Sequence, residues 1–522
     1  MRILAYNAGH DGSAVLLSDG RLEFCLEAEK DSGSRHALLS PNLFIHSLEL
    51  AGIPDVVALS GWHRRSNDLI GRTDGGYTGI GPDAMARSSA TVAGRSFPVF
   101  HSSHERSHIL CSYGLSPFPQ GQPCYVLVWE GKIGSFYRVD ENVRIEKIGE
   151  ALPEPGAKYA FLYGLADPTI PMFPTMVRME DAGKLMALAA YGAERSAGAD
   201  ERTLIDEIMA MPNIYGSGGV KAHKARLKDS PVCNSGLTSQ RFKDVARLFS
   251  DALFDRFLTF ARDNLSERLP LLISGGCGLN CDWNSRWKEC GLFTDVFVPP
   301  CTNDSGVALG AAIDAMLFHT RSAKLDWSVY AGEEFVDDLG GDAGIAARAL
   351  DLDEICRLLA NGAVIAWVQG RYEMGPRALG NRSMLAAPFD AAMCDKLNQI
   401  KQREAFRPIA PICMQEDFRS HFDGSNDESP YMLYFQKVTS KALGAVTHVD
   451  GSARAQTVTA AQNPRMHALL SRFKNLTGHG VLCNTSLNFK GTGFINRMSD
   501  LVQYSRDRGL DGFVVGDRFF QL

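Results

Sequence analysis

Two histidines four positions apart, His104 and His108 in the stretch HERSH, could bind a metal ion together. If the stretch is helical, residues i and i+4 lie one above the other on one face, so both imidazoles can reach one ion. Most such pairs bind nothing and are ordinary residues of a helix face, so a third ligand decides between the two interpretations. Asp304, in TNDSGVALGAA, could supply a carboxylate, although it could equally cap the helix that follows. Two imidazoles and one carboxylate leave coordination positions open, which suits Zn²⁺ or Fe²⁺ acting as a Lewis acid.

Two glycine turns have the composition of anion-binding loops. In NAGHDGS the glycines, Gly12 among them, permit close approach of an anion, with His10 and Asp11 at the tip of the turn. A plain hairpin loop is the alternative there. In SGGCGLN, residues 274–280, a glycine pair between a predicted strand and a predicted helix suits a nucleotide resting on backbone amides. Lys184, at an apparent helix start, is usually a solvated charge but could also reach a phosphate.

The strongest chemical signal is a set of cations in the last third of the chain. Several of them lie in segments that contain Gly, Pro, Asn or Ser, and together they form no helical stripe with acidic partners. In a chain with a formal net charge of -6, this context favours an anion pocket over solvated surface charge, because arginine binds phosphate and carboxylate oxygens in a bidentate manner. The set comprises Arg377, Arg382, Lys401, Arg403, Arg407 and Arg454, with Asn484 and Ser486 as neutral donors.

The elements that must position these residues alternate between strands and helices. RILAYN, SAVLLS and LEFCLEAE predict three strands at the N-terminus, with SDG as a hairpin turn, and DVVALSGW predicts a fourth. A similar layout returns at 124–140, where the apolar strand CYVLVW runs into Glu130 and a second strand follows a short turn. The repeat predicts two related α/β subdomains that enclose a cleft. The acidic stretch at 333–344 predicts the boundary to a second α/β domain.

The bulk composition is that of an ordinary globular protein, with 45% hydrophobic and 22% charged residues. Its 522 residues predict several domains. The acidic balance, with a pI near 6.1, argues against a protein that coats nucleic acid, which needs a basic surface. The 12 cysteines form no regular framework, which is typical of reduced thiols in a cytoplasmic enzyme. Neither a secretory leader nor an apolar run of roughly 20 residues, as a membrane helix needs, is evident.

The chain resembles the O-carbamoyltransferases that decorate natural products, including nodulation factors and several antibiotics. GPRALGNRS, FRPIAP, HVDGSARAQTV and NTSLN resemble the C-terminal signatures of that family, and the resemblance runs nearly end to end. It implies an α/β fold with a duplicated Kae1-like domain of the actin and sugar-kinase (ASKHA) class over residues 1–335. A YrdC-like α/β domain would follow over residues 345–522. The chain is short for the family, and in this it resembles the members that act on hydroxymethyl cephems.

The resemblance implies two reactions in two sites. Carbamoyl phosphate and ATP with Mg²⁺ would give carbamoyl adenylate and pyrophosphate in the YrdC-like domain. The adenylate would pass internally to the Kae1-like domain, where a hydroxyl of a small natural-product acceptor attacks the carbamoyl carbon and AMP leaves. Enclosed transfer would protect an intermediate that hydrolyses readily. Neither nucleic acid nor a membrane is an expected partner, and the acceptor and the oligomeric state are left open.

The resemblance also implies roles for individual residues. His10, with Asp11 beside it, would be the general base for the acceptor hydroxyl. The ligands of Fe²⁺ or Zn²⁺ would be His104, His108 and Asp304. A nucleotide site would comprise Gly12, Glu130, Lys184, Gly275, Gly276, Asn280 and Asp304. A carbamoyl phosphate site would comprise Arg377, Lys401, Arg407, Arg454, Asn484 and Ser486, with Arg382 and Arg403 on the ATP side.

Two departures from the family and two alternative functions accompany this prediction. Glu130 stands where the fold usually has Asp, so its contact with the nucleotide is left open. The stretch EAEKDSGSRHA at 27–37 replaces one that is rich in Glu and Arg in many relatives, and this difference points to a different acceptor. The chain could carbamoylate another acceptor such as a tRNA base, or it could be a non-catalytic nucleotide-binding regulator. The acidic balance disfavours RNA, and the intact set of cations disfavours a regulator.

Overall fold

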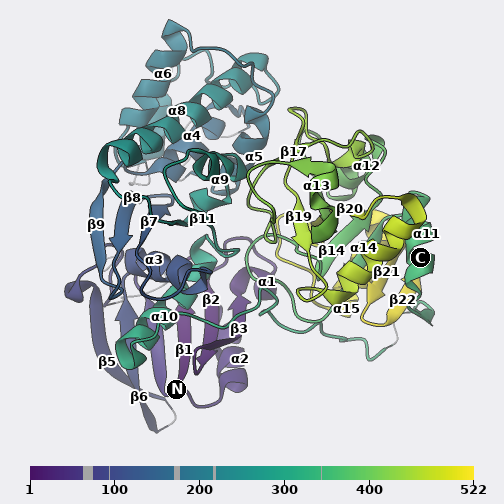
Figure 1. Ribbon diagram of the computed structural model, residues 1–522, viewed down its shortest axis with the longest axis horizontal. Helices are drawn as coiled ribbons and strands as arrows, with labels where there is room; N and C mark the ends of the chain where they lie inside the picture. Colours follow the sequence, from purple (N-terminus) through teal and green to yellow (C-terminus); the bar gives the residue numbers. More distant parts are fainter. Residues whose placement is uncertain (63–73, 93, 170–176, 215–218, 342–343) are drawn as a thin grey trace. The chain divides into compact units, whose positions relative to one another are not determined.

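The computed structural model describes residues 1–62, 74–92, 94–169, 177–214, 219–341 and 344–522 (Figure 1). By their internal contacts they divide into two compact units, residues 1–120 with 299–522, and residues 121–298. The predicted boundary between residues 335 and 345 falls within the first unit, whose two larger sheets come from sequence on either side of it.

A six-stranded sheet opens the first unit, in the order β3-β2-β1-β4-β6-β5. β1, β2 and β3 pair antiparallel, whereas β1–β4 and β4–β6 are parallel, and β5 closes the edge antiparallel. Asp19 and Gly20 form the turn between β2 and β3 with positive φ, as the SDG signal predicts. The bounds are β1 Arg2–Asn7, β2 Ser13–Ser18, β3 Arg21–Glu27, β4 Val56–Ser60, β5 Met85–Val92 and β6 Arg95–Ser102, with α1 Ala28–Ser32 and α2 Pro41–Ala51.

Two helices far apart in the sequence pack together over this sheet. α10 (Val307–Thr320) packs on β1, β2 and β4, and α3 (His104–Leu115) packs on α10. All of α10 from Val307 to Met316 is buried, in keeping with a sequence that is apolar except for Asp314, whose carboxylate is paired with Arg106. Gly310 allows the close approach, because a Cβ there would lie 1.8 Å from the Ser107 carbonyl oxygen. This packing brings the start of α10 to the N-terminal turn of α3.

The second unit repeats the first sheet's strand order. Its strands run β11-β10-β7-β8-β9, with β7, β8 and β9 antiparallel and β7–β10 and β10–β11 parallel. The internal repeat predicted from the sequence is therefore visible in strand order and direction. The strands are β7 Cys124–Trp129, β8 Gly134–Val139, β9 Ile145–Glu150, β10 Leu271–Ser274 and β11 Val296–Phe297. The helices are α4 Pro155–Ala166, α5 Glu180–Ala189, α6 Ala199–Ala210, α7 Gly219–Arg226, α8 Gln240–Asn264 and α9 Cys281–Glu289.

A third, eight-stranded sheet in the order β12-β22-β21-β13-β14-β20-β15-β19 completes the first unit. Successive residues of its strands face opposite sides of the sheet, and each side has its own hydrophobic core. Ala366 faces the core formed with α12 and α15, and Ile365 faces the core formed with α11 and α14. The strands are β12 Ala347–Ala349, β13 Ile365–Val368, β14 Arg382–Ala386, β15 Ala410–Met414, β19 Gln456–Val458, β20 Val481–Ser486, β21 Gly512–Val515 and β22 Arg518–Gln521. The helices are α11 Leu352–Ala360, α12 Ala392–Ile400, α13 Phe418–His421, α14 Pro464–Thr477 and α15 Met498–Arg508, and β16 Phe422–Asp423, β17 Gln436–Val438 and β18 Ser452–Ala453 form a small sheet.

Candidate active sites

Both predicted metal-binding histidines lie in the buried helix α3. Ser103 caps the start of the helix, because its hydroxyl accepts a hydrogen bond from Arg106 N at 3.0 Å and so satisfies one of the free amides of the first turn. His104 and His108 lie on one face of this helix, as their spacing predicts, and their Nε2 atoms are 3.2 Å apart. Their side chains are 0% and 1% exposed, so neither is a solvated residue of a helix surface.

Asp304 meets the two histidines from the other helix. It begins the short 3-10 turn Asp304–Gly306 that leads into α10. Its Oδ1 lies 3.2 Å from His108 Nε2, and its Oδ2 lies 3.6 Å from His104 Nε2. Ligand atoms of the three residues all lie within 4.8 Å of one another. The three residues predicted to share an ion therefore converge at one buried point.

The donor set fits a divalent transition metal. Burial by itself would raise the pKa of the Asp304 carboxyl, but its interactions with His10, His104 and His108 hold that pKa well below its usual value. The carboxylate is thus the acceptor-only form that a cation needs. Two imidazoles and one carboxylate are ligands of Zn²⁺ and Fe²⁺, and they leave positions open for a substrate oxygen.

Two aromatic rings cover this cluster. Tyr77 stacks on His104 with ring centroids 4.4 Å apart, and Trp62 meets His104 and His10 edge-on at 5.6 and 5.4 Å. Glu105, the second residue of HERSH, does not point into the cluster, because its carboxylate accepts a hydrogen bond from Gly79 N at 2.6 Å. That bond fixes the loop that carries Tyr77 against the start of α3.

The turn after β1 places His10 against the same carboxylate. His10 Nε2 lies 3.2 Å from Asp304 Oδ2, and its Nδ1 lies 3.6 Å from Asp11 Oδ2. Asn7 holds the turn, since its side-chain amide donates to the carbonyl oxygens of His10, Asp11 and Asp304 at 3.1, 3.3 and 3.2 Å. The predicted base therefore lies beside the predicted metal ligands.

Two partners of Asp11 were missed from the sequence. His36 Nδ1 lies 2.8 Å from Asp11 Oδ1, and Asn303 donates its amide to Asp11 Oδ2 at 3.1 Å. Burial opposes both charges, yet the contact between Asp11 and His36 lowers the pKa of the carboxyl and raises the pKa of the imidazole. Asn303 adjoins Asp304 in the sequence and could have been suspected. His36 lies in a loop with no motif, and no local signal identifies it.

Most of the predicted nucleotide contacts lie at one edge of the second unit's sheet. Val128 and Ser274 are paired in register on the parallel strands β7 and β10, so the carboxyl ends of both strands meet. Glu130 follows β7 and accepts a hydrogen bond from Ile133 N at 2.8 Å, and Gly275 follows β10 with a φ of 102°. A Cβ at Gly275 would lie 2.5 Å from the Trp129 carbonyl oxygen, which explains the glycine.

The remaining residues of that prediction are divided between the two units, and Asp304 belongs with Gly12 to the first. Asn280 caps α9 by accepting from Trp283 N at 3.3 Å, and Gly276 opens the turn before it. Lys184 lies on α5 with its Nζ 3.2 Å from Asp181 Oδ1. Gly12 belongs to the first unit, where its N–H donates to Ala37 O at 2.8 Å. A nucleotide site made by these residues stays a prediction.

Near the third sheet, the buried Lys401 lies beside Ser486 and close to the charges of Arg403 and Arg407. Its Nζ donates to the backbone carbonyl and to the hydroxyl of Ser486 at 2.6 and 3.2 Å. Burial lowers the pKa of Lys401 well below its usual value, and the positive charges of Arg403 and Arg407 lower it further. Burial likewise lowers the pKa of Arg403 to about 9, with Arg407 and Arg454 contributing. These cations repel one another, and a bound anion would relieve that repulsion.

Arg382 and Asn484 have structural contacts that the sequence did not indicate. The Arg382 guanidinium is fully buried and donates to the carbonyl oxygens of Gln369, Gly370 and Asn381 and to Asn496 Oδ1, all within 3.0 Å. These contacts favour a structural role over the predicted position on the ATP side. Asn484 donates its amide to the Ala378 carbonyl oxygen at 3.0 Å, so it holds the loop that carries Arg377.

Two family models match this chain, Carbamoyltransferase N-terminus over residues 93–313 and Carbamoyltransferase C-terminus over residues 356–521. A 3'-hydroxymethylcephem-O-carbamoyltransferase of Amycolatopsis lactamdurans is 49% identical over 524 residues, covering 100% of this chain and 99% of the relative. The chain belongs to the carbamoyltransferase family. A protein of the same description from Streptomyces clavuligerus is 48% identical, with 100% and 99% covered. Nodulation protein U of Rhizobium tropici is 33% identical, with 97% and 94% covered.

Solved structures similar to this member of the carbamoyltransferase family share little sequence with it. The component A of (R)-2-hydroxyglutaryl-CoA dehydratase from Acidaminococcus fermentans aligns with a TM-score of 0.35 and 13% identity, covering 60% of this chain and 96% of its own. The archaeal actin homologue Ta0583 aligns with a TM-score of 0.30 and 13% identity, covering 62% and 100%. Among the described residues, no helix is long and apolar enough to cross a membrane.

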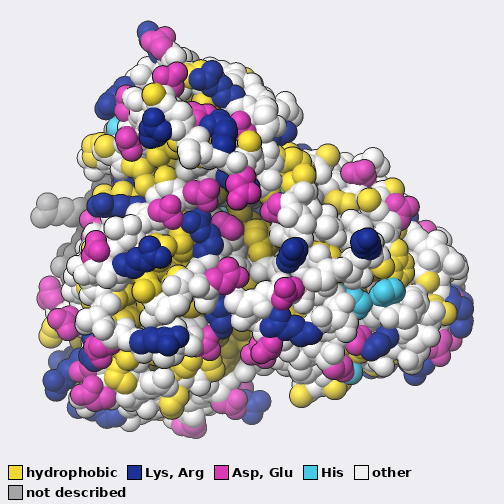
Figure 2. Space-filling model, turned by 45° about the horizontal axis from the view of Figure 1, so that its top comes forward, with side chains coloured by type: hydrophobic (Ala, Val, Ile, Leu, Met, Phe, Trp, Pro, Cys, Tyr) yellow, Lys and Arg dark blue, Asp and Glu magenta, His cyan; other side chains and the backbone are white. Residues whose placement is uncertain are grey.

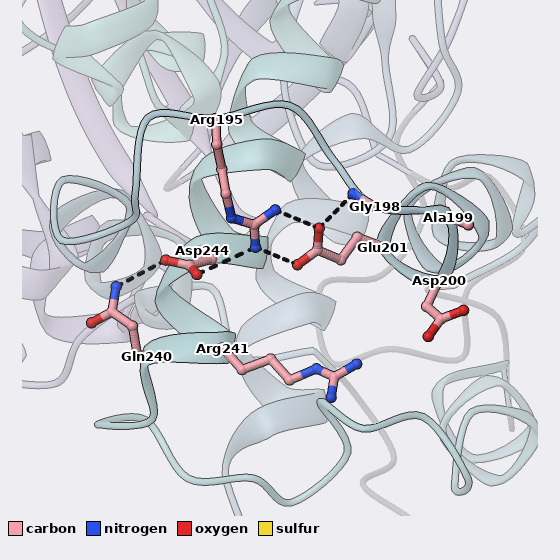
Figure 3. Close-up of a pocket in the computed structure, with 8 residues that line it drawn as sticks. All are labelled: Arg195, Gly198, Ala199, Asp200, Glu201, Gln240, Arg241 and Asp244. Atoms are coloured by element: carbon pink, nitrogen blue, oxygen red, sulfur yellow. Dashed lines mark hydrogen bonds and ion pairs between the residues drawn. The ribbon is translucent and has the colours of Figure 1, made fainter.

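A cavity of about 550 Å³ in the second unit of this carbamoyltransferase-family chain is lined by none of the predicted site residues (Figure 3). In it the Arg195 guanidinium lies between two carboxylates, 2.6 Å from Glu201 Oε1 and 3.3 Å from Asp244 Oδ2. The hydrogen bond from Arg195 lowers the pKa of Glu201 to about 2. Glu201 also accepts from Gly198 N at 2.8 Å and thereby caps α6. Both carboxylates contact Arg195 and also accept hydrogen bonds from backbone N–H groups, which favours a structural role for this cluster.

Proposed function

We propose that this protein is an ATP-dependent O-carbamoyltransferase that carbamoylates a small-molecule hydroxyl in two steps. The observation that carries the proposal is the buried cluster of His104, His108 and Asp304 with His10 against its carboxylate. It occurs in a chain that is 48–49% identical to O-carbamoyltransferases over its whole length.

The first step would take place on the cations of the third sheet. Carbamoyl phosphate and one water give carbamate and phosphate, and a carbamate oxygen then attacks the α-phosphorus of ATP. Carbamoyl adenylate forms, and pyrophosphate leaves with Mg²⁺. Positive charges held in place before the reaction stabilise the charge of this crowded polyanionic transition state. The phosphate oxygens would be held by Arg377, Lys401, Arg407, Arg454 and Ser486, with Arg403 on the ATP side and Asn484 supporting the Arg377 backbone.

In the second step, His10 would remove the proton of the acceptor hydroxyl. The hydroxyl oxygen forms a bond to the carbamoyl carbon while the bond from that carbon to the AMP oxygen breaks. A neutral imidazole is suited to accept this proton near neutral pH. Asp11 orients the ring from its Nδ1 side, and Asp304 lies at Nε2. An Fe²⁺ or Zn²⁺ ion bound by the three ligands would supply Lewis-acid stabilisation of the oxygen's negative charge.

The acceptor we propose is a 3'-hydroxymethyl cephem, the compound named in the description of the two relatives that are nearly half identical. Both relatives match over the whole chain, and this full-length similarity supports the proposed acceptor. On the face shown in Figure 2, Lys and Arg side chains alternate with Asp and Glu and form no continuous basic stripe. This distribution favours a small acceptor over a polyanion.

The repeated strand order of the first two sheets supports an actin and sugar-kinase class for residues 1–335, of the Kae1-like kind. We assign residues 345–522, with the eight-stranded sheet covered by helices on both faces, to a YrdC-like domain. This assignment places adenylate formation on the third sheet and carbamoyl transfer at the cluster of His104, His108 and Asp304.

The test is conversion of the proposed acceptor. Purified protein would be incubated with carbamoyl phosphate, ATP, Mg²⁺ and a 3'-hydroxymethyl cephem, and the carbamate ester would be measured by mass spectrometry. A 3'-methyl cephem, which lacks the hydroxyl, is the matched control and should give no product. Absence of the ester from folded, metal-loaded protein would contradict the proposed acceptor.

A further inference from the structure

A buried charge pair joins the end of β3 and α1 to the third sheet. Lys30, in α1, has a side chain only 2% exposed, and its Nζ lies 2.8 Å from Glu27 Oε1. The same Nζ donates to the carbonyl oxygens of Glu373 and Gly375 at 2.5 and 2.9 Å. Gly375 N donates to the same Glu27 oxygen at 2.6 Å. The pair therefore binds both ends of one backbone turn that lies some 345 residues further along the chain.

That turn belongs to the loop between β13 and β14, residues 369–381, which we call the Arg377 loop. Its carboxyl side is fixed by Glu373, whose Oε1 accepts from the backbone N–H groups of Leu379 and Asn381 at 2.6 and 2.8 Å. Two aromatic rings, those of Tyr372 and Phe494, lie 5.0 and 4.7 Å from Lys30 Nζ and exclude water from it. The charges of Lys30 and Glu27 that hold this loop are thus nearly completely buried, with side chains 2% and 7% exposed.

The other end of this connection reaches the turn that carries the predicted base. Ala28 N, one residue after Glu27, donates to Gly12 O at 2.7 Å, and Gly12 follows Asp11. Asp11 contacts His10 and His36. A continuous series of short contacts therefore runs from the Arg377 loop through Glu27 and Lys30 to the acceptor-side turn.

We propose that Glu27 and Lys30 are positioning residues that hold the Arg377 loop in register with the His10 turn, so that carbamoyl adenylate made at one is consumed at the other before water reaches it. This inference rests on the proposed two-step function. Without the pair, adenylate would be hydrolysed to carbamate and AMP, so pyrophosphate would still be released but less product would form. The effect of the pair is therefore measured by the ratio of pyrophosphate released to carbamate ester formed.

The test uses Lys30→Met and Glu27→Gln in the full-length protein, with saturating carbamoyl phosphate, ATP and acceptor. The methionine keeps the apolar contact with the two rings, and the glutamine keeps the volume of Glu27. We expect a ratio near one in the wild type and a rise of at least about threefold in each variant that remains folded, with pyrophosphate release retained. Lys324→Met is the matched control, because Lys324 also lies over an aromatic ring and donates to a backbone carbonyl, but both belong to Tyr113 in α3 and not to the Arg377 loop. Its ratio should stay near one.

Two results would overturn the inference. An unchanged ratio in the folded variants would show that the pair does not keep the two sites in register. A parallel loss of pyrophosphate and ester at constant ratio would assign the pair to adenylate formation alone. If the wild type itself releases no pyrophosphate, the proposed function fails first, and the role of the pair fails with it.

Discussion

The ion pair between Arg106 and Asp314 ties the helix that carries both histidines to the helix that follows Asp304. Arg106 Nε and Nη2 lie 2.7 and 2.8 Å from the two Asp314 oxygens, and Ser102 donates its hydroxyl to Asp314 Oδ2 at 2.7 Å. The side chains are 10% and 1% exposed. Removing one partner of a buried pair leaves the other charge desolvated, which costs about 3–5 kcal/mol. Arg106→Met should therefore destabilise the packing of α3 on α10 by roughly that amount.

Native-state hydrogen exchange of α3 peptides measures this effect directly. A loss of about 3–5 kcal/mol in opening free energy corresponds to exchange faster by roughly two to four powers of ten. Arg138→Met is the control, because Arg138 makes the same kind of pair with Glu267 at 2.9 Å, but the two side chains are 28% and 47% exposed. An exposed pair contributes about 0.2–1 kcal/mol, so β8 exchange should change less than about tenfold. The double variant Arg106→Met with Asp314→Leu should recover much of the loss. Equal effects in the buried and exposed pairs would refute the reasoning.

Three further predictions follow from the sites. His104→Ala should remove bound metal, measured by elemental analysis, and abolish ester formation while pyrophosphate release persists; loss of both activities in folded protein would argue against separate sites. Arg454→Ala should slow pyrophosphate release by about tenfold or more, since a charge-assisted hydrogen bond to the substrate anion is worth about 1.5–3 kcal/mol; unchanged kinetics would exclude Arg454 from the site. Glu201→Gln should lower the melting temperature near neutral pH. That deficit should shrink as pH falls from 4.5 towards about 2. The hydrogen bond from Arg195 lowers the pKa of Glu201 to about 2, and the stabilisation from this bond is lost when Glu201 becomes protonated. A deficit that does not depend on pH would contradict this.

Local sequence signals predicted the elements that carry the site. RILAYN and SAVLLS coincide with β1 and β2, because short apolar runs and the Asp19-Gly20 turn are short-range properties of the chain. The spacing of His104 and His108 predicted a shared helix face for the same reason.

Contacts set by tertiary packing could not be predicted in this way. The sequence around Arg382 resembles that around the neighbouring cations, yet its guanidinium donates its hydrogen bonds to groups within the fold. Those groups are at Asn496 and in the segment that follows β13. His36 reaches Asp11 only after the chain has folded back from α1. The pairing of Glu27 and Lys30 with Gly375 likewise depends on segments that are distant in sequence.

Pyrophosphate release in the absence of acceptor tests the central claim most directly. Purified protein with ATP and Mg²⁺ would be assayed with and without carbamoyl phosphate. The two-step account predicts pyrophosphate only when carbamoyl phosphate is present, accompanied by one equivalent of inorganic phosphate. Pyrophosphate that appears without carbamoyl phosphate, or no pyrophosphate from folded protein with both substrates, would contradict adenylate formation on the third sheet.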